Sequence, residues 1–485
     1  MTASRMFRLG MICAIGGTGV GLFFSWSSGI ALLMCSVVIG VAMLWFPNRL
    51  FAAGVSLIVC VAIFCGAWFR AAERVLWWET LPPTSARLER ALVVGLVEQK
   101  ENTKQATLQP IACGASSCPS TFVLGSFPTF ADIADGDILA LSCALEKPER
   151  FTDDFDYPKV LAKDGIGFVC RFPKDWRKEG ESGGLFASLV RTVRVSAERT
   201  IERVIPEPEA GLVLGLIVGG DGRLPKEIQD GFSKTGLSHI VAVSGYNVSI
   251  IAILCMNILI FCGLYRQKAL WGALLGVFFF TVLVGASASA VRAAFMVSIA
   301  LLATRMGRMG HPINGILCAA AGMLFINPLL LRYDIGFQLS FAATLGIFLV
   351  TPFALLSIRM GDIVATTLAA ELFVLPIILF HFHALPILSL LVNLCVLPLV
   401  PLAMMLGSFA FLGATLVPPM GMVFGFPAFL VSHAIIVIIQ FFAAQPFASI
   451  SIQHFSLGMV MLWYGISFMA LALLRRKFPT VAAFG

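Results

Sequence analysis

Long runs of apolar residues without a single charge constrain this chain more than any other feature. Residues 30–46 and 269–284 are two examples. Each approaches the roughly 20 residues that a helix needs to cross a bilayer, whereas a membrane β-barrel shows alternating strands of about ten residues. Charged residues make up only 13% of the 485 residues, against about 25% in a soluble domain. The sequence therefore predicts a polytopic α-helical membrane protein and excludes a soluble enzyme, a coiled coil and a disordered chain.

The charges are unevenly distributed along the chain. Residues 70–236 contain 24 of the 27 acidic and 21 of the 34 basic residues, so the apolar remainder carries a basic excess. Such an excess beside apolar runs is typical of the positive-inside rule, and charge alone does not indicate a nucleic-acid partner. With Arg5, Arg8 and Arg49 in the cytoplasm, residue 70 emerges on the outer side. The three spans that precede it are predicted at residues 9–24, 30–46 and 50–69.

Residues 71–172 predict a small external β domain. Clusters of Gly, Pro, Asn and Asp bound its strand-like runs. A short helix is expected at residues 157–163, before the last strand. Five short strands with one helix favour an OB-like β-barrel, although the same periodicity fits several small β folds. The five runs cover residues 91–97, 107–112, 121–126, 138–145 and 167–172.

Cysteine usage agrees with an external location for this domain. It holds four of the 12 cysteines, namely Cys113, Cys118, Cys143 and Cys170. Four cysteines allow three pairings, and a loop disulfide between Cys113 and Cys118 is favoured in an oxidising compartment. Zinc is disfavoured, because the domain has no histidine and no paired Cys-x-x-Cys motif. The alternative is that the four are small, unpaired packing residues.

Residues 185–205 predict an amphipathic helix. Apolar residues recur at helical spacing on one side, with Arg and Glu on the other. The helix is too charged to span and is expected on the membrane surface. Basic residues in and before it are candidate contacts for an anionic ligand or lipid, with a solvated face as the alternative. They are Arg171, Lys174, Arg177, Lys178, Arg191 and Arg194.

A polar elbow of small residues connects a short external helix to an apolar span. Pro225 suits the first turn of a helix, and Gly236 suits its end. The elbow reads Thr235-Gly-Leu-Ser-His-Ile-Val-Ala-Val-Ser-Gly245. Three further motifs are Ser289-Ala-Val-Arg292-Ala-Ala-Phe, Asp334-Ile-Gly-Phe-Gln-Leu-Ser340-Phe-Ala-Ala-Thr-Leu-Gly346 and Phe155-Asp-Tyr-Pro-Lys-Val-Leu-Ala-Lys-Asp-Gly165.

These four motifs resemble those of the ComEC-type competence family, over about residues 88–470. The resemblance implies a bacterial inner-membrane channel that takes up single-stranded DNA during natural transformation. Together with the apolar runs and charges described above, it divides the chain into three N-terminal transmembrane helices (1–70), an external OB-like domain (71–172), amphipathic or interfacial helices (173–236), a competence-type channel domain (237–477) and a short tail (478–485).

The sequence departs from the family pattern in two places. Gly245-Tyr246-Asn247 stands where many relatives have Gly-Leu-His, so no role of that histidine is carried over. The chain also ends without the metallo-β-lactamase-like domain of longer members, and the ligand motif His-x-His-x-Asp-His is absent. His381-Phe-His383 is followed by Ala-Leu-Pro and does not replace it. We therefore expect a short form with no metal, no cofactor and no enzymatic activity.

Ionisable residues inside apolar spans are the next candidates, because charges at membrane depth are costly. Arg292 is expected to face a conduit or to extend to the headgroups, and Glu371 to pair with Arg292 or another helix or to be protonated. Asp334 and Arg332 are expected to anchor at the interface. For the polar residues of the predicted path, which are listed next, inter-helix hydrogen bonding is an equally good interpretation. The predicted DNA path comprises Arg292, Ser238, His239, Ser244, Asn247, Gln338 and Ser340.

Prolines interrupt the later spans, and broken helices at membrane depth line protein or an aqueous cavity. We expect about seven crossings after the external domain, with residues 387–416 as one tilted span or two half-spans. A secondary transporter built on broken helices is the alternative function. The interrupting residues are Pro376, Pro386, Pro398 and Pro401.

The resemblance also implies partners. The sequence has no phosphate-binding loop, so a cytoplasmic DNA motor is expected to supply the work. A periplasmic DNA receptor and a separate nuclease would deliver the single strand, membrane lipid would surround the spans, and a homo-oligomer is left open. External aromatics would either stack bases or fill the core of the domain; these are Phe122, Phe127 and Phe130.

Overall fold

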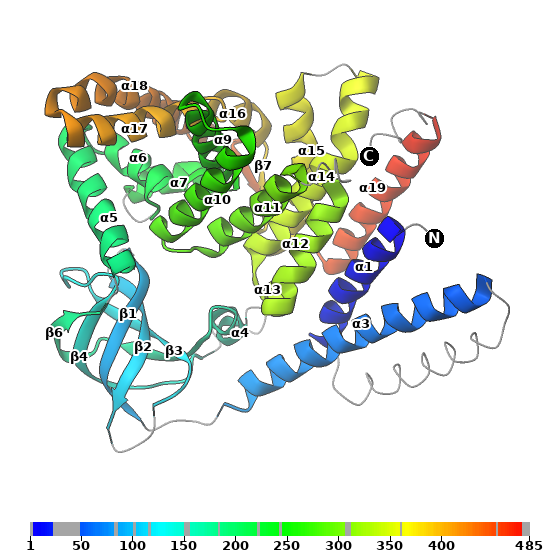
Figure 1. Ribbon diagram of the computed structural model, residues 1–485, viewed down its shortest axis with the longest axis horizontal. Helices are drawn as coiled ribbons and strands as arrows, with labels where there is room; N and C mark the ends of the chain where they lie inside the picture. Colours follow the sequence, from blue (N-terminus) through cyan, green and yellow to red (C-terminus); the bar gives the residue numbers. More distant parts are fainter. Residues whose placement is uncertain are drawn as a thin grey trace.

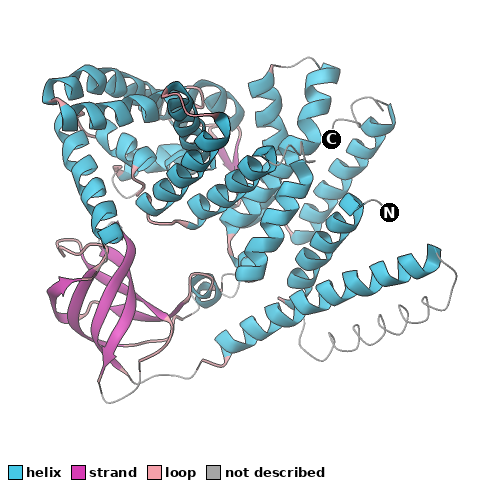
Figure 2. Ribbon diagram, in the orientation of Figure 1, coloured by secondary structure: helices cyan, strands magenta, loops and turns pink. Residues whose placement is uncertain are grey.

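The computed structural model describes residues 3–22, 49–81, 86–99, 103–114, 118–149, 156–182, 185–220, 224–241, 245–305, 312–358, 361–452 and 454–477. The predicted span at 30–46, Ser244 and the tail at 478–485 lie outside these residues. A six-stranded sheet occupies one end of the molecule, and helices make up almost all of the rest (Figures 1 and 2).

The sheet has the strand order β5-β3-β2-β1-β4-β6. All neighbouring pairs are antiparallel except β3 and β5. Apolar side chains alternate along the strands, so that Leu139 and Leu141 on β4 point into the core beside Leu88, Leu108 and Phe127. The strands are β1 (Arg87–Gln99), β2 (Thr103–Cys113), β3 (Phe122–Pro128), β4 (Asp137–Ala144), β5 (Ile166–Arg171) and β6 (Lys174–Glu181).

Strand β6 corrects the sequence-based domain boundary at residue 172. It reads Lys174-Asp-Trp-Arg-Lys-Glu-Gly-Glu181 and pairs with β4 at the edge of the sheet. Its side chains are mostly exposed, so it lacks the apolar alternation by which strands are recognised. The basic residues predicted as a strip before the amphipathic helix therefore belong to the sheet.

The edge strand β5 also approaches β4, which lies next to the opposite edge strand β6. Glu146, just after β4, and Val169 on β5 exchange backbone hydrogen bonds of 3.0 and 2.8 Å. A disulfide joins Cys143 to Cys170 across the same gap, and a second joins Cys113 to Cys118. Closure into an OB-like barrel stays a prediction.

The helical part confirms a polytopic α-helical membrane protein. Among the described residues, six helical segments are long and apolar enough to cross a membrane, at Ala288–Arg305, Ile335–Phe353, Asp362–Phe382, Ser389–Leu416, Pro418–Ala443 and Leu457–Leu474. Two shorter apolar helices cover Gly245–Phe261 and Ile313–Ile326.

The helices before the elbow are α1 (Ala3–Gly21), α3 (Arg49–Glu79), α4 (Tyr157–Ala162), α5 (Leu185–Val204), α6 (Glu209–Ile217) and α7 (Lys226–Lys234). From the elbow onward they are α8 (Ser238–Val241), α9 (Gly245–Phe261), α10 (Arg266–Leu283), α11 (Ala288–Arg305), α12 (Pro312–Ile326), α13 (Leu330–Tyr333), α14 (Ile335–Ile358), α15 (Asp362–Phe382), α16 (Ser389–Val396), α17 (Leu399–Leu416), α18 (Pro418–Ala443) and α19 (Leu457–Lys477). The short strands β7 (Ala384–Pro386) and β8 (Ser449–Ser451) pair between spans.

The prolines act differently from one another. Pro376 lies inside the continuous helix α15, so the prediction of a break there is wrong. Pro386 ends β7, and Pro398 separates α16 from α17. Residues 387–416 therefore form two helical segments divided near Pro398.

Candidate functional site

A buried ion pair lies among the membrane helices. Arg292 on α11 places Nη1 3.2 Å from Oδ2 of Asp334, which lies between α13 and α14. The two residues are 4% and 5% exposed. Asp334 also accepts a hydrogen bond of 3.0 Å from the backbone N–H of Phe337 and so caps α14. The expectation that Asp334 is an interfacial anchor is wrong, because its carboxylate is buried and paired.

Gly336 in the same motif provides the space for this pair. A Cβ on Gly336 would lie 2.8 Å from Nη2 of Arg292 and 3.1 Å from Oδ1 of Asp334. Real Cβ atoms do not approach other atoms so closely, so any larger residue would displace the guanidinium. The glycine of Asp334-Ile-Gly336 is thereby explained by packing.

Glu371 bonds to another helix, one of the alternatives expected for it. Its Oε1 accepts a hydrogen bond of 2.7 Å from the hydroxyl of Ser389 on α16. It does not pair with Arg292, which Asp334 engages instead. The carboxylate thus joins α15 to the interrupted helix pair α16–α17.

The elbow turns where α7 ends. Thr235 donates from its hydroxyl to the carbonyl of Gly231 at 2.9 Å, and Gly236 then takes a φ of 77°. A Cβ on Gly236 would lie 3.0 Å from Cγ of Pro386, so the elbow packs tightly on β7. Glycine suits position 236 for two reasons, because it adopts the left-handed backbone conformation without strain and because it has no Cβ to contact Pro386. Residues 242–244 lie outside the described part of the chain.

The structure brings only part of the predicted path together. Ser238 and His239 are exposed, whereas Asn247 is 1% exposed in the packed start of α9. Helix α11 packs against α9, and a Cβ on Gly245 would lie 3.5 Å from Cβ of Ala293. Arg292 thus lies beside the elbow in the fold, but its guanidinium is directed at Asp334.

Gln338 and Ser340 lie on α14 after the ion pair. The side chain of Gln338 contacts Nε2 of His381 at 3.0 Å and donates to the carbonyl of Leu331 at 2.9 Å. Ser340 is half-buried, and its carbonyl accepts a hydrogen bond from Thr344. Gln338 therefore joins α13, α14 and α15 by hydrogen bonds. This agrees with inter-helix hydrogen bonding, the alternative to lining a path.

Two of the predicted external contacts instead join α5 to neighbouring elements, Arg194 to α10 and Arg191 to the sheet. Arg194 is 7% exposed and donates through Nε and Nη2 to the carbonyl of Leu283, at 3.1 and 2.6 Å. It thereby satisfies a carbonyl at the end of α10. Arg191 places Nη1 2.7 Å from Oε2 of Glu181 on β6. The prediction of external contacts is wrong for Arg194, because its guanidinium is buried, and Arg191 is largely engaged.

An ion network surrounds Arg191. Lys178 lies 2.7 Å from Glu181 and 2.9 Å from the buried Asp137. These hydrogen bonds, that of Glu181 first, raise the pKa of Lys178. The same bond from Lys178, reinforced by the charge of Arg191, lowers the pKa of Glu181. The sheet and α5 are thus joined by charges that favour each other's ionised forms.

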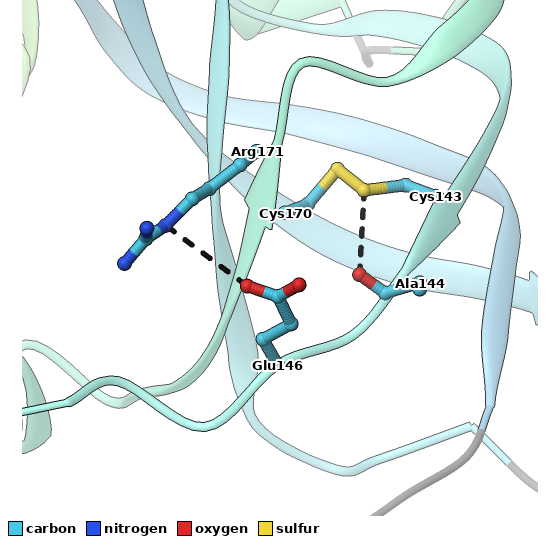
Figure 3. Close-up of a disulfide and its surroundings, with 5 residues drawn as sticks. All are labelled: Cys143, Ala144, Glu146, Cys170 and Arg171. Atoms are coloured by element: carbon cyan, nitrogen blue, oxygen red, sulfur yellow. Dashed lines mark hydrogen bonds and ion pairs between the residues drawn. A yellow bond between two sulfur atoms is a disulfide. The ribbon is translucent and has the colours of Figure 1, made fainter.

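The remaining basic candidates are exposed on the sheet. Arg171 lies 4.0 Å from Glu146 next to the Cys143–Cys170 disulfide (Figure 3). Lys174 is exposed, and the side chain of Arg177 is 78% exposed. The aromatic residues divide, because Phe127 is fully buried in the core, Phe122 is half-buried and Phe130 is 81% exposed. A base-stacking role for Phe127 is therefore wrong.

The pair of Glu209 and His433 was not predicted from the sequence. Glu209 on α6 is 4% exposed, and its Oε1 lies 2.7 Å from Nδ1 of His433 on α18. An acidic residue at the start of the apolar run at 209–217 was the available signal, since such a carboxylate needs a buried partner. The contact holds the amphipathic region to a candidate span.

Comparison with known proteins agrees with these motifs. Residues 216–477 match the Competence protein family. The chain is also 30% identical over 289 residues to ComE operon protein 3 of Bacillus subtilis (strain 168). That alignment covers 57% of this chain and 36% of the relative, so the chain spans about a third of the relative's length. No solved structure matches the chain. Because the family match includes the elbow, the Arg292–Asp334 pair and all six candidate spans, this chain belongs to the Competence protein family.

Proposed function

We propose that this protein is the bacterial inner-membrane channel through which a single DNA strand reaches the cytoplasm during natural transformation. The observation that carries the proposal is the polar elbow within the family segment. Ser238 and His239 are exposed where the helical backbone is interrupted between α7 and α8. Irregular backbone at membrane depth is tolerated only beside protein or a water-filled cavity. Such a cavity is what a hydrophilic strand needs.

The buried ion pair supports the same proposal as a positioning element. Arg292 and Asp334 join α11 to α14, and α11 packs against the elbow helix α9. Neither charge is stable in lipid alone, so their pairing fixes the arrangement of these helices. The elbow can then keep one shape while a strand passes.

The proposal includes partners and a source of work. Moving phosphates inward against an inside-negative potential costs about 2.3 kcal/mol per charge per 100 mV. We propose that a cytoplasmic motor supplies this work, that a periplasmic receptor delivers the DNA, and that a separate nuclease makes it single-stranded. The chain itself acts as a conduit without a chemical step.

Deletion of the gene in a naturally transformable host tests the proposal. Labelled duplex DNA should still reach the periplasm but not the cytoplasm, and a plasmid copy should restore entry. Unchanged cytoplasmic entry in a host without a second copy would end the channel proposal. The secondary transporter would then take its place.

A further inference from the structure

An open groove, lined by residues of α5 alone, runs along the outward face of this helix. Its volume is about 480 Å³. Six of its seven lining side chains are arginine or carry a hydroxyl. The lining residues are Arg191, Thr192, Val195, Ser196, Arg199, Thr200 and Arg203. This composition is that of an anion site, because guanidinium groups and hydroxyls donate hydrogen bonds to phosphate oxygens.

The donors in the middle and at the end of the groove are available. Arg199 and Arg203 are exposed, and neither forms an ion pair with a residue that the structure describes. Ser196 and Thr200 likewise make no side-chain hydrogen bond within the described ranges, whereas Thr192 donates to the carbonyl of Ser188 at 2.8 Å. The acidic residues of α5 do not line the groove.

The shape of the groove favours a chain of phosphates over a single one. From Arg191 to Arg203 the helix rises about 18 Å, and positions four residues apart are separated by about 6 Å. That repeat is comparable to the distance between successive phosphates of an extended strand. Arg199 and Arg203 have this separation, as do Ser196 and Thr200.

The packing of α5 argues against lipid as the ligand. A helix lying on a membrane turns its apolar face to the lipid. Here Val190, Ala197 and Ile201 are at most 4% exposed, and α5 packs on α6, α17 and α18. Protein therefore covers the middle of the apolar face, whereas Phe186 and Leu189 near the start of the helix are 47% and 52% exposed. A location on the membrane surface stays a prediction. Arg199 and Arg203 face outward from the protein.

The position of α5 gives the groove a direction. Its first turns join the sheet through Arg191 and Glu181, and its later turns reach the candidate spans α17 and α18 (Figure 1). We propose that this groove binds the phosphodiester backbone of a single strand on its way from the sheet domain to the membrane helices. The inference deepens the proposed function and rests on it.

The test uses the full chain in phosphatidylcholine nanodiscs, with a fluorescent oligothymidylate titrated at several salt concentrations. Arg199→Gln/Arg203→Gln should weaken binding at least about tenfold. It should also reduce the slope of log K against log salt by about 1.4, since each phosphate contact to a single strand contributes about 0.7. Ser196→Ala/Thr200→Val should weaken binding with the slope unchanged, because neutral donors displace no counterions.

Arg266→Gln/Lys268→Gln is the matched control. It removes the same charge from exposed residues at the far end of α10, and it should leave affinity and slope as in the unmodified protein. If the Arg199/Arg203 variant also binds as the unmodified protein does, the groove inference is overturned, whereas the proposed function stands if uptake still requires the chain. If the unmodified protein binds no oligothymidylate and uptake does not need it, both fail.

Nanodiscs containing phosphatidylglycerol separate the sources of phosphate. Anionic lipid should weaken oligothymidylate binding by the same factor in the unmodified protein and in the Arg199/Arg203 variant, since it repels the oligonucleotide generally. A loss confined to the unmodified protein would mean that lipid headgroups occupy the groove, which would overturn the inference.

Discussion

Arg292 and Asp334 are 42 positions apart in sequence, and their side chains meet at 3.2 Å in the interior of the helical region. The pair links the Arg-Ala-Ala motif of α11 to the Asp-Ile-Gly motif that opens α14. Two motifs that define the resemblance to competence proteins are thus halves of one contact. Removal of either partner would leave a buried charge uncompensated.

We predict that Arg292→Ala destabilises the protein by about 3–5 kcal/mol, because Asp334 would lose its partner. The level of folded protein should fall, and uptake should fall with it. Arg292→Met/Asp334→Asn removes both charges and retains the cap on α14. It should restore most of the abundance and the uptake together, as measured by immunoblot and by transformation frequency. Normal abundance without uptake would instead assign Arg292 a direct contact with the strand.

Gly336→Ala should lower the thermal midpoint of the purified protein. The added Cβ would lie 2.8 Å from Arg292 Nη2, and overpacking of this kind costs about 1–3 kcal/mol. Gly465→Ala on α19 is the matched control, since a Cβ there meets no atom within 4 Å. A midpoint that is equal in the two variants would refute the packing role of Gly336.

The sequence was sufficient for the membrane class and for five of the six strands of the large sheet. Their apolar runs reflect burial, which is a local property of the sequence. The sequence did not predict β6, because the charged residues of this strand pair at an exposed edge. It also did not predict which residue pairs with Arg292. Asp334 and Glu371 are both acidic residues within apolar segments, and only the packing of α11 against α14 decides between them. The partners of Arg191 and Arg194 likewise lie on elements distant in sequence, so they could not be predicted from the sequence.

Acidification should loosen the junction between the sheet and α5. Lys178 and then Arg191 hold the pKa of Glu181 below its usual range, so its contribution to stability is present above the unfolded-state pKa. This contribution is lost as the pH falls through the lowered, folded-state pKa. The thermal midpoint should therefore drop less on acidification in Glu181→Gln than in the unmodified protein. Glu146→Gln, which removes a long exposed pair, should leave the pH dependence unchanged, and identical profiles for all three would contradict the account.

The two disulfides should differ in their effect on stability. Cys143 and Cys170 close a loop of 27 residues and join β4 to β5, whereas Cys113 and Cys118 are five residues apart. Loop-closure entropy assigns about 3.5 kcal/mol to the first and about 2 kcal/mol to the second. Paired Cys→Ala variants should accordingly differ in resistance of the sheet domain to proteolysis. Equal resistance would contradict the expected larger contribution of the Cys143–Cys170 disulfide.

The same cysteines report which side of the membrane the sheet faces. Because the sheet domain is predicted to lie outside, an impermeant thiol reagent should label Cys113 in intact cells only after reduction. Labelling from the cytoplasmic side alone would overturn the predicted topology, and labelling that is equal with and without reductant would contradict the Cys113–Cys118 bond.

Crosslinking during uptake tests whether a DNA strand passes the elbow, as we propose. A photoreactive side chain replaces the exposed His239, or, as the control, Phe426, an exposed apolar residue on α18. Labelled DNA is supplied to transformable cells, uptake is arrested, and the cells are illuminated. We expect crosslinks between the strand and position 239 and none at position 426. Efficient uptake without a crosslink at 239, or with equal crosslinking at both positions, would contradict the proposal.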